Sequence, residues 1–440
     1  MAARSLEQLS SIVSRNAAVL SQKLEARNIS SPTIQDVNAP DLSEIDSVAA
    51  TELVNAAREL QAIVQGREEQ LNLLGFSAFD SVSVGILLEF NIPSLVPLEG
   101  AISLHDLSAK TGLSEDKLTR IVRYAIINFI LREPEPGAIA HTALSAALAR
   151  DPKFATYLRL CLVDLAPVNA ALPAALRRWP ASESVTECAV NAAFDTSEPF
   201  FAWLSRDATR QARFDQGMAG FAGAGRSSAV EIAAFPWGAA LPAEAVVVDV
   251  GGGKGHFSKA LARAFPKFRV TVQDRKEVVE AVLRDDDDGG ETGSIDGVRF
   301  QAHSFFDPQP LHGADVYFLR QVIHDWPDRE AAGILRALTP ALKPGARVLV
   351  SEYGVPSPGE MQTSSSASAG QQQQHGPGIL EAKHIRQMDL QMMAVLNAKE
   401  RSADEFAKLF ALADERLKFK GAHRAPGDRK VCIFEAVWEP

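Results

Sequence analysis

The sequence predicts an α/β fold, with a doubly wound parallel sheet in its C-terminal half and a mostly α-helical domain before it. From about residue 236, short runs of β-branched residues alternate with helical segments, and the run Val246–Val250 leads into a glycine-rich turn. Before that point, apolar residues recur at helical spacing. Strands that alternate with helices are typical of a parallel sheet covered by helices on both faces.

The length and composition narrow the class of protein. A chain of 440 residues suggests two domains, which we place at 1–235 and 236–440. A formal net charge of -10 disfavours nucleic-acid binding, because that binding depends on cationic neutralisation of phosphates. The three cysteines lie far apart, which indicates no disulfide framework and a reduced, cytoplasmic compartment. We find neither a secretory signal nor an uninterrupted apolar run of ~18 residues, and therefore predict no membrane contact.

Two helices are predicted near the N-terminus, over 5–26 and about 49–73, with a polar loop over 28–47 between them. Each helix carries an apolar stripe that needs a covering partner. The stripes could pack within one chain or form a dimer contact, and the sequence favours neither.

A winged helix is predicted within 75–150, where two helices joined by a turn at Thr111–Gly112 precede a two-stranded wing. Such units often bind DNA, so a transcriptional regulator is one alternative function. Against it, Glu133 and Glu135 at the wing tip would repel phosphate, and residues 124–131 are apolar enough to be buried.

The C-terminal half should hold at least five strands and two unstructured inserts. The predicted strands are 246–250, 268–273, 298–302, 315–319 and 346–351. The inserts are an aspartate run over 284–290 and a serine- and glutamine-rich stretch over 357–378. In such a sheet, ligands bind beyond the carboxyl ends of the strands.

The glycine turn after the first strand is a candidate ligand site. Gly251 and Gly253 would allow a ligand to approach the backbone without a Cβ in the way. The spacing does not match the dinucleotide pattern, because His256 stands where the third glycine should be. Asp249, just before the turn, could bond polar groups of a ligand, and Asp274 is placed to bind two ribose hydroxyls. A purely structural turn is the alternative.

A histidine, His324, follows the predicted strand 315–319 and should lie at the same edge of the sheet. Helix capping by Asp325 explains its neighbour but not the histidine itself, which favours a catalytic base. A histidine base needs its second ring nitrogen held, and Glu352 and Glu400 are the candidate partners. No histidine shows metal-ligand spacing, so no metal is predicted.

Four motifs together resemble the class I S-adenosylmethionine-dependent O-methyltransferases, more narrowly the plant and fungal phenol (caffeate-type) enzymes and their fungal polyketide branch. These motifs are Asp249–Gly255, His324–Asp328, Ser351–Glu352 and Ala398–Ser402. The resemblance implies a Rossmann-like methyltransferase domain preceded by a dimerisation domain, and therefore a homodimer. It also implies methyl transfer from S-adenosyl-L-methionine to a phenolic hydroxyl of an aromatic secondary metabolite, of polyketide type.

The resemblance also assigns residues to the cofactor. Gly251, Gly253 and Asp274 keep the roles given above, and Phe305 and Trp326 would flank the adenine. Ser304 departs from the family, which usually has an aspartate there, and a weak cofactor-binding partner protein is therefore a second alternative. Arg320 stands where the plant enzymes carry lysine.

The remaining assignments concern the substrate. A phenol has a pKa near ~10, whereas histidine, with a pKa near ~6.5, is largely neutral at pH 7 and can accept the phenolic proton. The predicted substrate-pocket residues are Phe214, Met218, Asp325, Met388 and Met392. The last two lie one helical turn apart and could equally be core.

Overall fold

The computed structural model describes residues 4–223, 228–285, 294–295, 297–357, 378–428 and 430–440. The two predicted unstructured inserts, 284–290 and 357–378, lie almost wholly outside these residues. Contacts between Cα atoms divide the chain into two compact units. The sheet unit comprises Ala171–Phe200 and the described residues from 228 to 440, and the helical unit comprises the described residues from 4 to 170 and from 201 to 223. A domain boundary at 235 stays a prediction.

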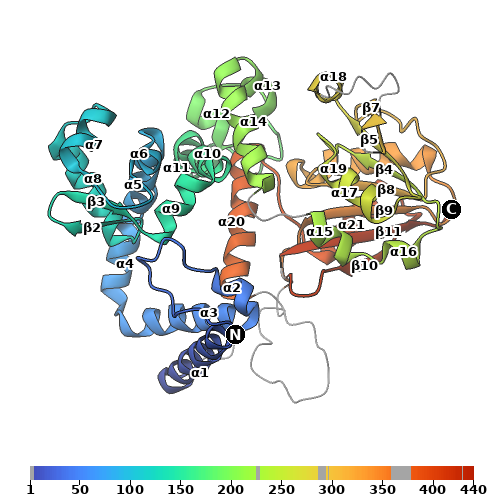
Figure 1. Cartoon of the computed structure of the whole chain (residues 1–440). Coiled ribbons are helices and arrows are strands. Elements are labelled where there is room, and N and C mark those ends of the chain that lie inside the picture. The colour runs from blue at the N-terminus through green and yellow to red at the C-terminus, as the bar shows by residue number, and fades with distance from the viewer. Residues whose placement is uncertain (1–3, 224–227, 286–293, 296, 358–377, 429) are drawn as a thin grey trace. The chain divides into compact units, whose positions relative to one another are not determined.

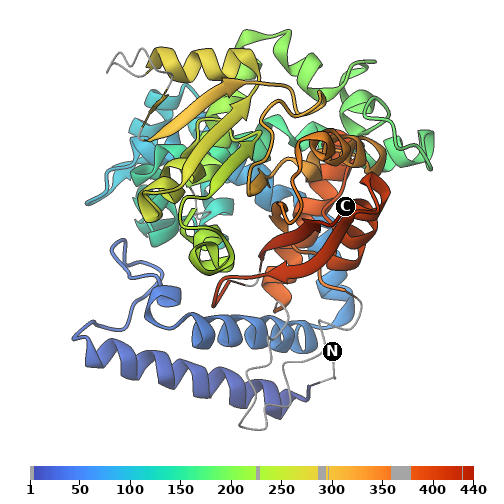
Figure 2. The same ribbon diagram turned by 90° about the vertical axis from the view of Figure 1, so that its right-hand side faces the viewer.

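The helical unit begins with two helices that pack side by side, α1 (Leu6–Ala26) and α3 (Ser47–Val64) (Figure 2). The single helix predicted over 49–73 is wrong, because the chain breaks at Gly66. This glycine has a φ of 84°, a left-handed conformation that ends the helix, and α4 (Arg67–Phe76) starts after it. The other helices of this unit are α2 (Leu42–Ile45), α5 (Ala78–Glu89), α6 (Ile92–Leu95), α9 (Ala143–Arg150), α10 (Pro152–Arg159), the π-helix η1 (Leu160–Asp164) and α14 (Ala208–Gly223). The helices α11 (Ala166–Arg178) and α13 (Phe200–Ser205) run across the division between the units.

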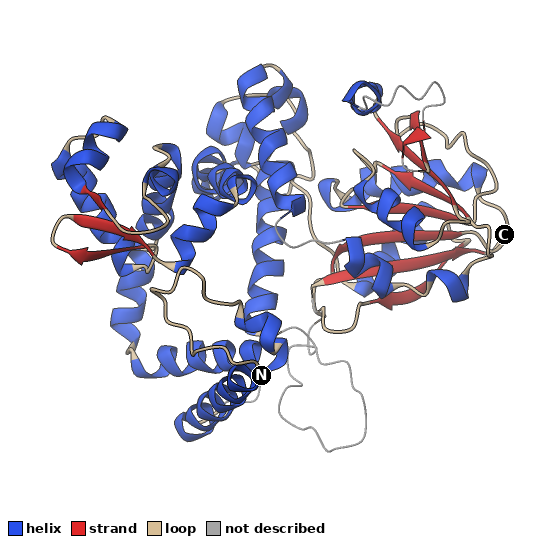
Figure 3. Ribbon diagram, viewed as in Figure 1, coloured by secondary structure: helices blue, strands red, loops and turns tan. Residues whose placement is uncertain are grey.

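The predicted winged helix is present in this unit. Its helices are α7 (Leu104–Thr111) and α8 (Glu115–Ile127), and its sheet has the order β1 (Ile102–Ser103), β3 (Ala138–His141), β2 (Leu131–Glu135) (Figure 3). Its core includes Leu107, Leu118, Val122, Leu131 and Ile139. The predicted burial of 124–131 is wrong for Ile127 and Phe129, which are 72% and 61% exposed.

In the part of the chain that the structure describes, eight strands form the sheet of the sheet unit. Their order is β10 (Leu417–His423), β11 (Val431–Trp438), β9 (Arg347–Tyr353), β8 (Val316–Arg320), β4 (Val246–Val250), β5 (Arg269–Asp274), β7 (Val298–Ala302), β6 (Ser294–Ile295) (Figure 1). The five central strands, from β9 to β7, are parallel, which confirms the predicted sheet. The antiparallel strands β6, β10 and β11 were not predicted.

Helices cover both faces of this sheet, as a doubly wound fold requires. Alternate residues of β4 point to opposite faces, so Val248 and Val250 join one core cluster while Val247 joins the other. The first cluster includes α19 (Asp328–Leu338) and α21 (Ala403–Ala413). The second includes residues of α15 (Ser228–Ala234), α16 (Trp237–Ala240), α17 (His256–Ala264) and α18 (Lys276–Asp285). The unit also contains α12 (Ala189–Phe194), α20 (Ile379–Leu396) and the 3-10 turns η2 (Ile323–Asp325) and η3 (Thr339–Ala341).

Two helical stretches, Arg67–Glu89 and Pro152–Arg178, have the length and composition of a membrane span. Little of either stretch is buried, since the buried shares of their apolar windows are 22% and 17%. Apolar helices of soluble proteins meet the same criteria, so this finding is weak evidence for a membrane. The absence of membrane contact stays a prediction.

Candidate active site

The predicted site residues of the sheet unit converge on the carboxyl edge of the parallel strands. The strand β4 leads into the glycine turn, β5 ends in Asp274, and β7 leads to Ser304. The strand β8 ends in Arg320 just before η2, and β9 carries Glu352 near its end. Parallel strands present these ends together, which brings residues far apart in sequence into one site.

The glycine turn exposes its backbone. Gly251 and Gly253 have φ values of 74° and 57°, which few other residues adopt. A Cβ on Gly251 would lie 2.8 Å from a methyl carbon of Val322, whereas a Cβ on Gly253 would meet nothing within 4 Å. The Gly253 N–H donates to Asp274 Oδ2 at 2.8 Å. The carboxylate of Asp274 therefore braces the turn and leaves open space above Gly253.

Asp249 is a buried acid beside this turn. It is 1% exposed, and its Oδ2 accepts from the Ser258 hydroxyl at 2.6 Å. Its Oδ1 finds no partner among the described residues. Burial raises the pKa of Asp249 to about 6. An unmet buried acceptor is costly, so the position suits a ligand that brings a donor.

Aromatic rings lie close to the turn. The ring centroids of Phe305 and Trp326 are 6.1 Å apart, and those of Phe306 and Trp326 are 4.8 Å apart. The Ser304 hydroxyl accepts from the Phe306 N–H at 3.3 Å. A Cβ on Gly251 would lie 3.7 Å from the Phe305 ring, so these rings border the turn. The contact between the rings of Phe306 and Trp326 was not predicted from the sequence.

Arg320 is engaged within the protein. Its Nε donates to Glu231 Oε1 at 2.7 Å, and the Glu231 side chain is fully buried. The Ser351 hydroxyl lies 3.4 Å from the same oxygen. Glu231 comes from α15, 89 residues away, and no sequence signal pointed to it.

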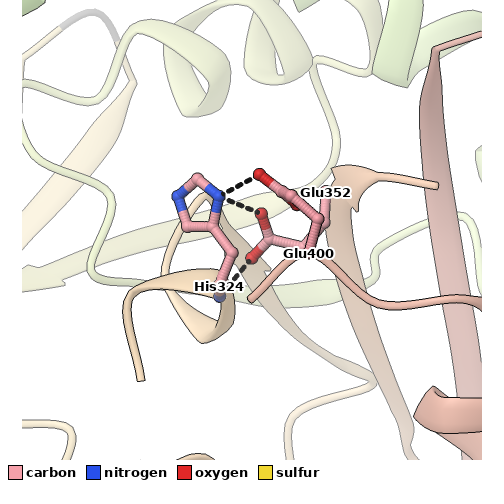
Figure 4. Close-up of side chains that lie close together, drawn as sticks. All are labelled: His324, Glu352 and Glu400. Atoms are coloured by element: carbon pink, nitrogen blue, oxygen red, sulfur yellow. Dashed lines mark hydrogen bonds and ion pairs between the residues drawn. The ribbon is translucent and has the colours of Figure 1, made fainter. Parts of the chain in front are cut away.

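His324 meets both predicted glutamates. Its Nδ1 lies 2.7 Å from Glu400 Oε1 and 3.5 Å from Glu352 Oε2 (Figure 4). The His324 side chain is 11% exposed, and those of Glu400 and Glu352 are at most 1% exposed. The second ring nitrogen, Nε2, points away from both glutamates (Figure 4). The glutamates thus hold the imidazole at Nδ1, while Nε2 lies 3.5 Å from Asp325 Oδ1.

The two glutamates bind different groups. Glu352 Oε1 accepts from the backbone N–H groups of Val322 and Ile323 at 3.1 and 3.0 Å. Its Oε2 accepts from the Gln321 amide at 2.8 Å. Glu352 therefore fixes the η2 turn, while Glu400 makes the short bond to the ring of His324.

The carboxylates around His324 shift its pKa. Burial lowers the pKa of His324, but the carboxylates of Glu352, Glu400 and Asp325 outweigh burial and raise it to about 10. Asp325 Oδ1 lies 3.5 Å from Nε2, and burial raises the pKa of this acid to about 7.

The predicted cap of the next helix is also corrected. The N-cap of α19 is Pro327, whereas Asp325 ends η2. Asp328, the first residue of α19, instead accepts from Arg401 at 2.8 Å and from Lys399 at 2.9 Å. Capping therefore does not explain Asp325, whose carboxylate lies beside the histidine ring.

The substrate-pocket residues fall into two groups. Met388 and Met392 lie on α20, a helix that packs against η2. Phe214 and Met218 lie on α14 in the helical unit, one helical turn apart. All four roles stay predictions.

A metal ion needs consideration, because His324, Glu352 and Glu400 offer ligand atoms within 4.8 Å of one another. The 2.7 Å contact between His324 and Glu400 is also a normal hydrogen bond. The geometry fits a metal site and also a hydrogen-bonded pair without a metal. The absence of a metal stays a prediction.

Comparison with known proteins identifies the family. A family model described as an O-methyltransferase domain matches residues 176–414. Chlorophenol O-methyltransferase of Trichoderma longibrachiatum is 36% identical over 423 residues, which cover 94% of this chain and 86% of the relative. The O-methyltransferase aurJ of Gibberella zeae is 33% identical and covers 97% of this chain and 96% of the relative. The chain belongs to the O-methyltransferase family.

Solved structures agree with this O-methyltransferase fold. Mitomycin 7-O-methyltransferase MmcR is 25% identical, with a TM-score of 0.66, over 84% of this chain and 97% of that one. The LepI complex with S-adenosylmethionine is 21% identical, with a TM-score of 0.72, over 98% of this chain and 100% of that one, and shows the fold alone. The O-methyltransferase described here is an S-adenosylmethionine-dependent enzyme that methylates a metabolite.

Proposed function

We propose that this enzyme methylates a phenolic hydroxyl of an aromatic secondary metabolite, of polyketide type, with His324 handling the phenolic proton. The observation that carries the proposal is the buried imidazole whose Nδ1 is held by Glu400 at 2.7 Å while Nε2 points away from both glutamates. A phenol is a weak nucleophile until it loses its proton, and a positioned histidine is the usual acceptor.

The productive complex has the proton on His324 Nε2 and a phenolate oxygen beside it. Glu400 fixes the ring orientation and stabilises the positive charge, as the carboxylate does in other histidine-based catalysts. Glu352 holds the turn that carries His324. S-adenosylmethionine supplies an electrophilic methyl group, and the protein contributes proximity and orientation.

The residues of the carboxyl edge fit that cofactor. Gly251 and Gly253 would form its loop, Asp274 would bind the ribose, and Phe305 and Trp326 would flank the adenine. The open space over Gly253 and the unmet Asp249 Oδ1 support this assignment. Ser304 would take the place of the usual family aspartate, and Arg320 would act from its ion pair with Glu231.

The pocket for the phenol would be lined by Asp325, Met388 and Met392 of the sheet unit. The roles of Phe214 and Met218, which lie in the helical unit, stay predictions from the sequence. Thioether side chains adapt to flat ring systems. Asp325 is the polar member of the group, and its carboxylate lies beside His324 Nε2.

We also propose a homodimer with its contact on the helical unit. The helix α4 buries no residue, although it exposes Leu71, Leu74 and Phe76 at 67%, 66% and 60%. An exposed apolar face of this kind marks an interaction site. We propose that a second copy of the chain covers it, and not a membrane. A Leu74→Glu variant that turns a dimer into a monomer in light scattering would support the contact.

The enzyme is proposed to be metal-free and cytoplasmic and to bind no nucleic acid. The Glu352 carboxylate is already committed to the η2 backbone, and the Glu400 oxygen to the histidine ring. Turnover that survives prolonged dialysis against a chelator would support this view, and loss of turnover restored by one divalent ion would overturn it.

The central test is methyl transfer by the purified chain from S-adenosylmethionine to a panel of hydroxylated anthraquinones, xanthones and simple phenols. We expect a mass gain of one methyl group on at least one phenol. The variant His324→Gln should lose turnover by ~10²-fold or more while still binding the cofactor. Unchanged turnover in His324→Gln would overturn the role of this residue.

A further inference from the structure

Gln273, near the end of β5, contacts the glycine turn through its backbone. Its carbonyl accepts from the N–H groups of Gly251 and Gly252 at 2.8 and 3.2 Å. These bonds continue the pairing of β4 with β5, in which Val250 lies opposite Gln273. The backbone of Gln273 therefore fixes the turn that would receive the cofactor.

The side chain of Gln273 reaches a second part of the same site. It meets Gln309, which belongs to the segment that follows β7. We call this segment, residues 303–311, the 303–311 loop, and it carries Ser304 and Phe305. Gln273 Nε2 donates to Gln309 Oε1 at 2.9 Å, and Gln309 Nε2 donates to Gln273 Oε1 at 2.8 Å. The two amides form a closed pair, the amide pair, that joins the strand to the loop.

The amide pair lies in the interior of the sheet unit. Gln273 is 1% exposed and Gln309 is 2% exposed. Gln273 Nε2 also donates to Gln301 Oε1 at 2.8 Å, and Gln309 Oε1 also accepts from the Leu311 N–H at 3.0 Å. Both nitrogens and both oxygens of the pair are therefore hydrogen-bonded, which offsets the cost of burying them.

Hydrogen-bonded amides contribute direction where apolar side chains would only fill space. The bonds of a buried amide pair form over a narrow range of distance and angle, and a shift would leave a buried donor and acceptor without a partner. An apolar core of the right volume keeps its stability but specifies its arrangement less uniquely. The amide pair therefore specifies where the loop lies, in addition to packing it.

The 303–311 loop is anchored on both sides of its predicted adenine residues. On one side, the His303 N–H donates to the Asp274 carbonyl at 2.9 Å. On the other side, the Gln309 N–H donates to the Ala337 carbonyl at 2.9 Å, and the Gln309 side chain joins the amide pair. The predicted adenine residues lie between these anchors, so their distance from the glycine turn depends on both.

We propose that Gln273 and Gln309 are positioning residues for the cofactor. Their amide pair sets the spacing between the glycine turn and the 303–311 loop, and with it the affinity for the adenosyl group. The proposal rests on the assignment of the glycine turn, Ser304 and Phe305 to the cofactor under the proposed function. A loop that holds the right spacing for only part of the time binds its ligand with an affinity reduced by that fraction.

The first test compares Gln273→Met, Gln309→Met and the double variant, by calorimetry with S-adenosylhomocysteine and by thermal unfolding of the full chain. Each single variant leaves one buried amide without its partner, so each should melt at a lower temperature than the wild type. The double variant replaces both amides by apolar side chains of similar length, so it should recover at least about half of that loss.

Cofactor affinity should not recover with stability. We expect the Kd for S-adenosylhomocysteine to rise about fivefold or more in each single variant and to stay raised by a similar factor in the double variant. The reason is that an apolar pair fills the space without fixing the loop. A double variant with wild-type affinity would overturn the proposal, because packing would then be all that the amides provide. Single variants with wild-type affinity would overturn it as well.

Gln301→Met is the matched control. Gln301 accepts from the same Gln273 nitrogen at 2.8 Å, but it lies on β7 and not on the loop. This variant leaves the bonds between Gln273 and Gln309 in place, so the Kd should stay within about twofold of the wild type. A rise equal to that of Gln309→Met would contradict a specific role for the amide pair.

The loss of affinity should concern the adenosyl end of the cofactor. Adenosine, measured by competition with S-adenosylhomocysteine, should lose the same factor in Gln309→Met as the whole ligand. In turnover, the KM for S-adenosylmethionine should rise while kcat at saturating cofactor stays within about twofold, because the pair acts on binding and not on the reacting atoms. A fall in kcat with an unchanged KM would overturn the proposal.

The outcomes separate this proposal from the proposed function, because calorimetry and thermal unfolding need no phenol. The expected losses of affinity in an enzyme that methylates no phenol would remove the proposed phenol methylation and support the amide pair. Methylation of a phenol with equal cofactor affinity in all variants would remove the role of the amide pair alone.

Discussion

Arg401 donates from Nε and Nη2 to one oxygen of Asp328, at 3.0 and 2.8 Å, although its own side chain is only 1% exposed. The same guanidinium donates to the carbonyls of Ile323 and Trp326, at 3.1 and 2.8 Å. These two carbonyls flank His324 and Asp325 in sequence. A single buried cation therefore holds both ends of the segment that carries His324.

We expect Arg401→Met to reduce the free energy of unfolding by about 2–3 kcal/mol, because the buried guanidinium is the donor to the carbonyls of Ile323 and Trp326 and the partner of the half-exposed Asp328. The value of kcat should fall as well, because the segment that holds His324 loosens. Denaturant unfolding and steady-state kinetics measure the two effects.

Lys399→Met is the control, because Lys399 binds the other oxygen of Asp328 at 2.9 Å from a position that is 37% exposed. A half-exposed pair contributes at most about 1 kcal/mol. Equal losses in the two variants would contradict the special role of Arg401.

The variants Glu400→Gln and Glu352→Gln should affect different properties, turnover in the first and stability in the second. In Glu400→Gln, the oxygen of the new amide can still accept from the ring, so the fold should persist, while kcat falls on the order of 10²-fold with the lost charge. In Glu352→Gln, an amide nitrogen can face the Gln321 amide, so about 1–3 kcal/mol of stability should be lost. The same loss of stability in both variants would contradict this division of work.

Local sequence signals account for the parallel sheet and for the place of the site. The run Val246–Val250 between turn residues is typical of a buried strand, and its β-branched residues occupy the strand as predicted. The glycines after it and the histidine after β8 followed from the rule that such strands end at one edge. The helix break at Gly66 was missed, because an apolar stripe continues on both sides of that glycine.

The chemistry of the site depends on contacts that sequence reasoning cannot place. His324 is 28 and 76 residues from Glu352 and Glu400, so the sum of their charges on the ring appears only in the folded chain. Arg320 and Glu231 give a second case, at a separation of 89 residues. The motif that includes Arg401 was recognised, but its bonds to the backbone around His324 were not.

The stability of the protein should fall as pH rises through the titration of His324. The pKa in the fold is about 10, above the ordinary 6.5, so the protonated ring stabilises the fold fully below pH 6.5. That contribution is lost progressively between pH 6.5 and about pH 10. The difference in unfolding free energy between the wild type and His324→Gln should shrink across this window by more than about 1 kcal/mol. A difference that is constant with pH would contradict the raised pKa.

The variants Gly251→Ala and Gly253→Ala distinguish two reasons for a glycine, which are packing against a side chain and open space for a ligand. Both impose a left-handed φ on alanine, at a cost of about 1 kcal/mol each. Only Gly251→Ala also meets a side chain, with Val322 at 2.8 Å, so it should lower the melting temperature more. In Gly253→Ala the added methyl group enters open space, so a loss of cofactor affinity in calorimetry would show that the cofactor lies there. Unchanged affinity would remove Gly253 from the cofactor site.

Ser304→Asp should strengthen cofactor binding. The Ser304 hydroxyl is an uncharged acceptor beside Phe305, at the position where the family usually has an aspartate for the adenine amine. A hydrogen bond to a charged acceptor is roughly twice as strong as a neutral one, and a gain of about 1 kcal/mol corresponds to a Kd about fivefold lower. Calorimetry with S-adenosylhomocysteine measures this without turnover. Ser304→Asn is the control, because it lengthens the side chain without adding charge, and it should leave the Kd within about twofold of the wild type. Weaker binding in Ser304→Asp would mean that the adenine amine does not face this residue, and the assignment of Phe305 and Trp326 to the adenine would fall with it.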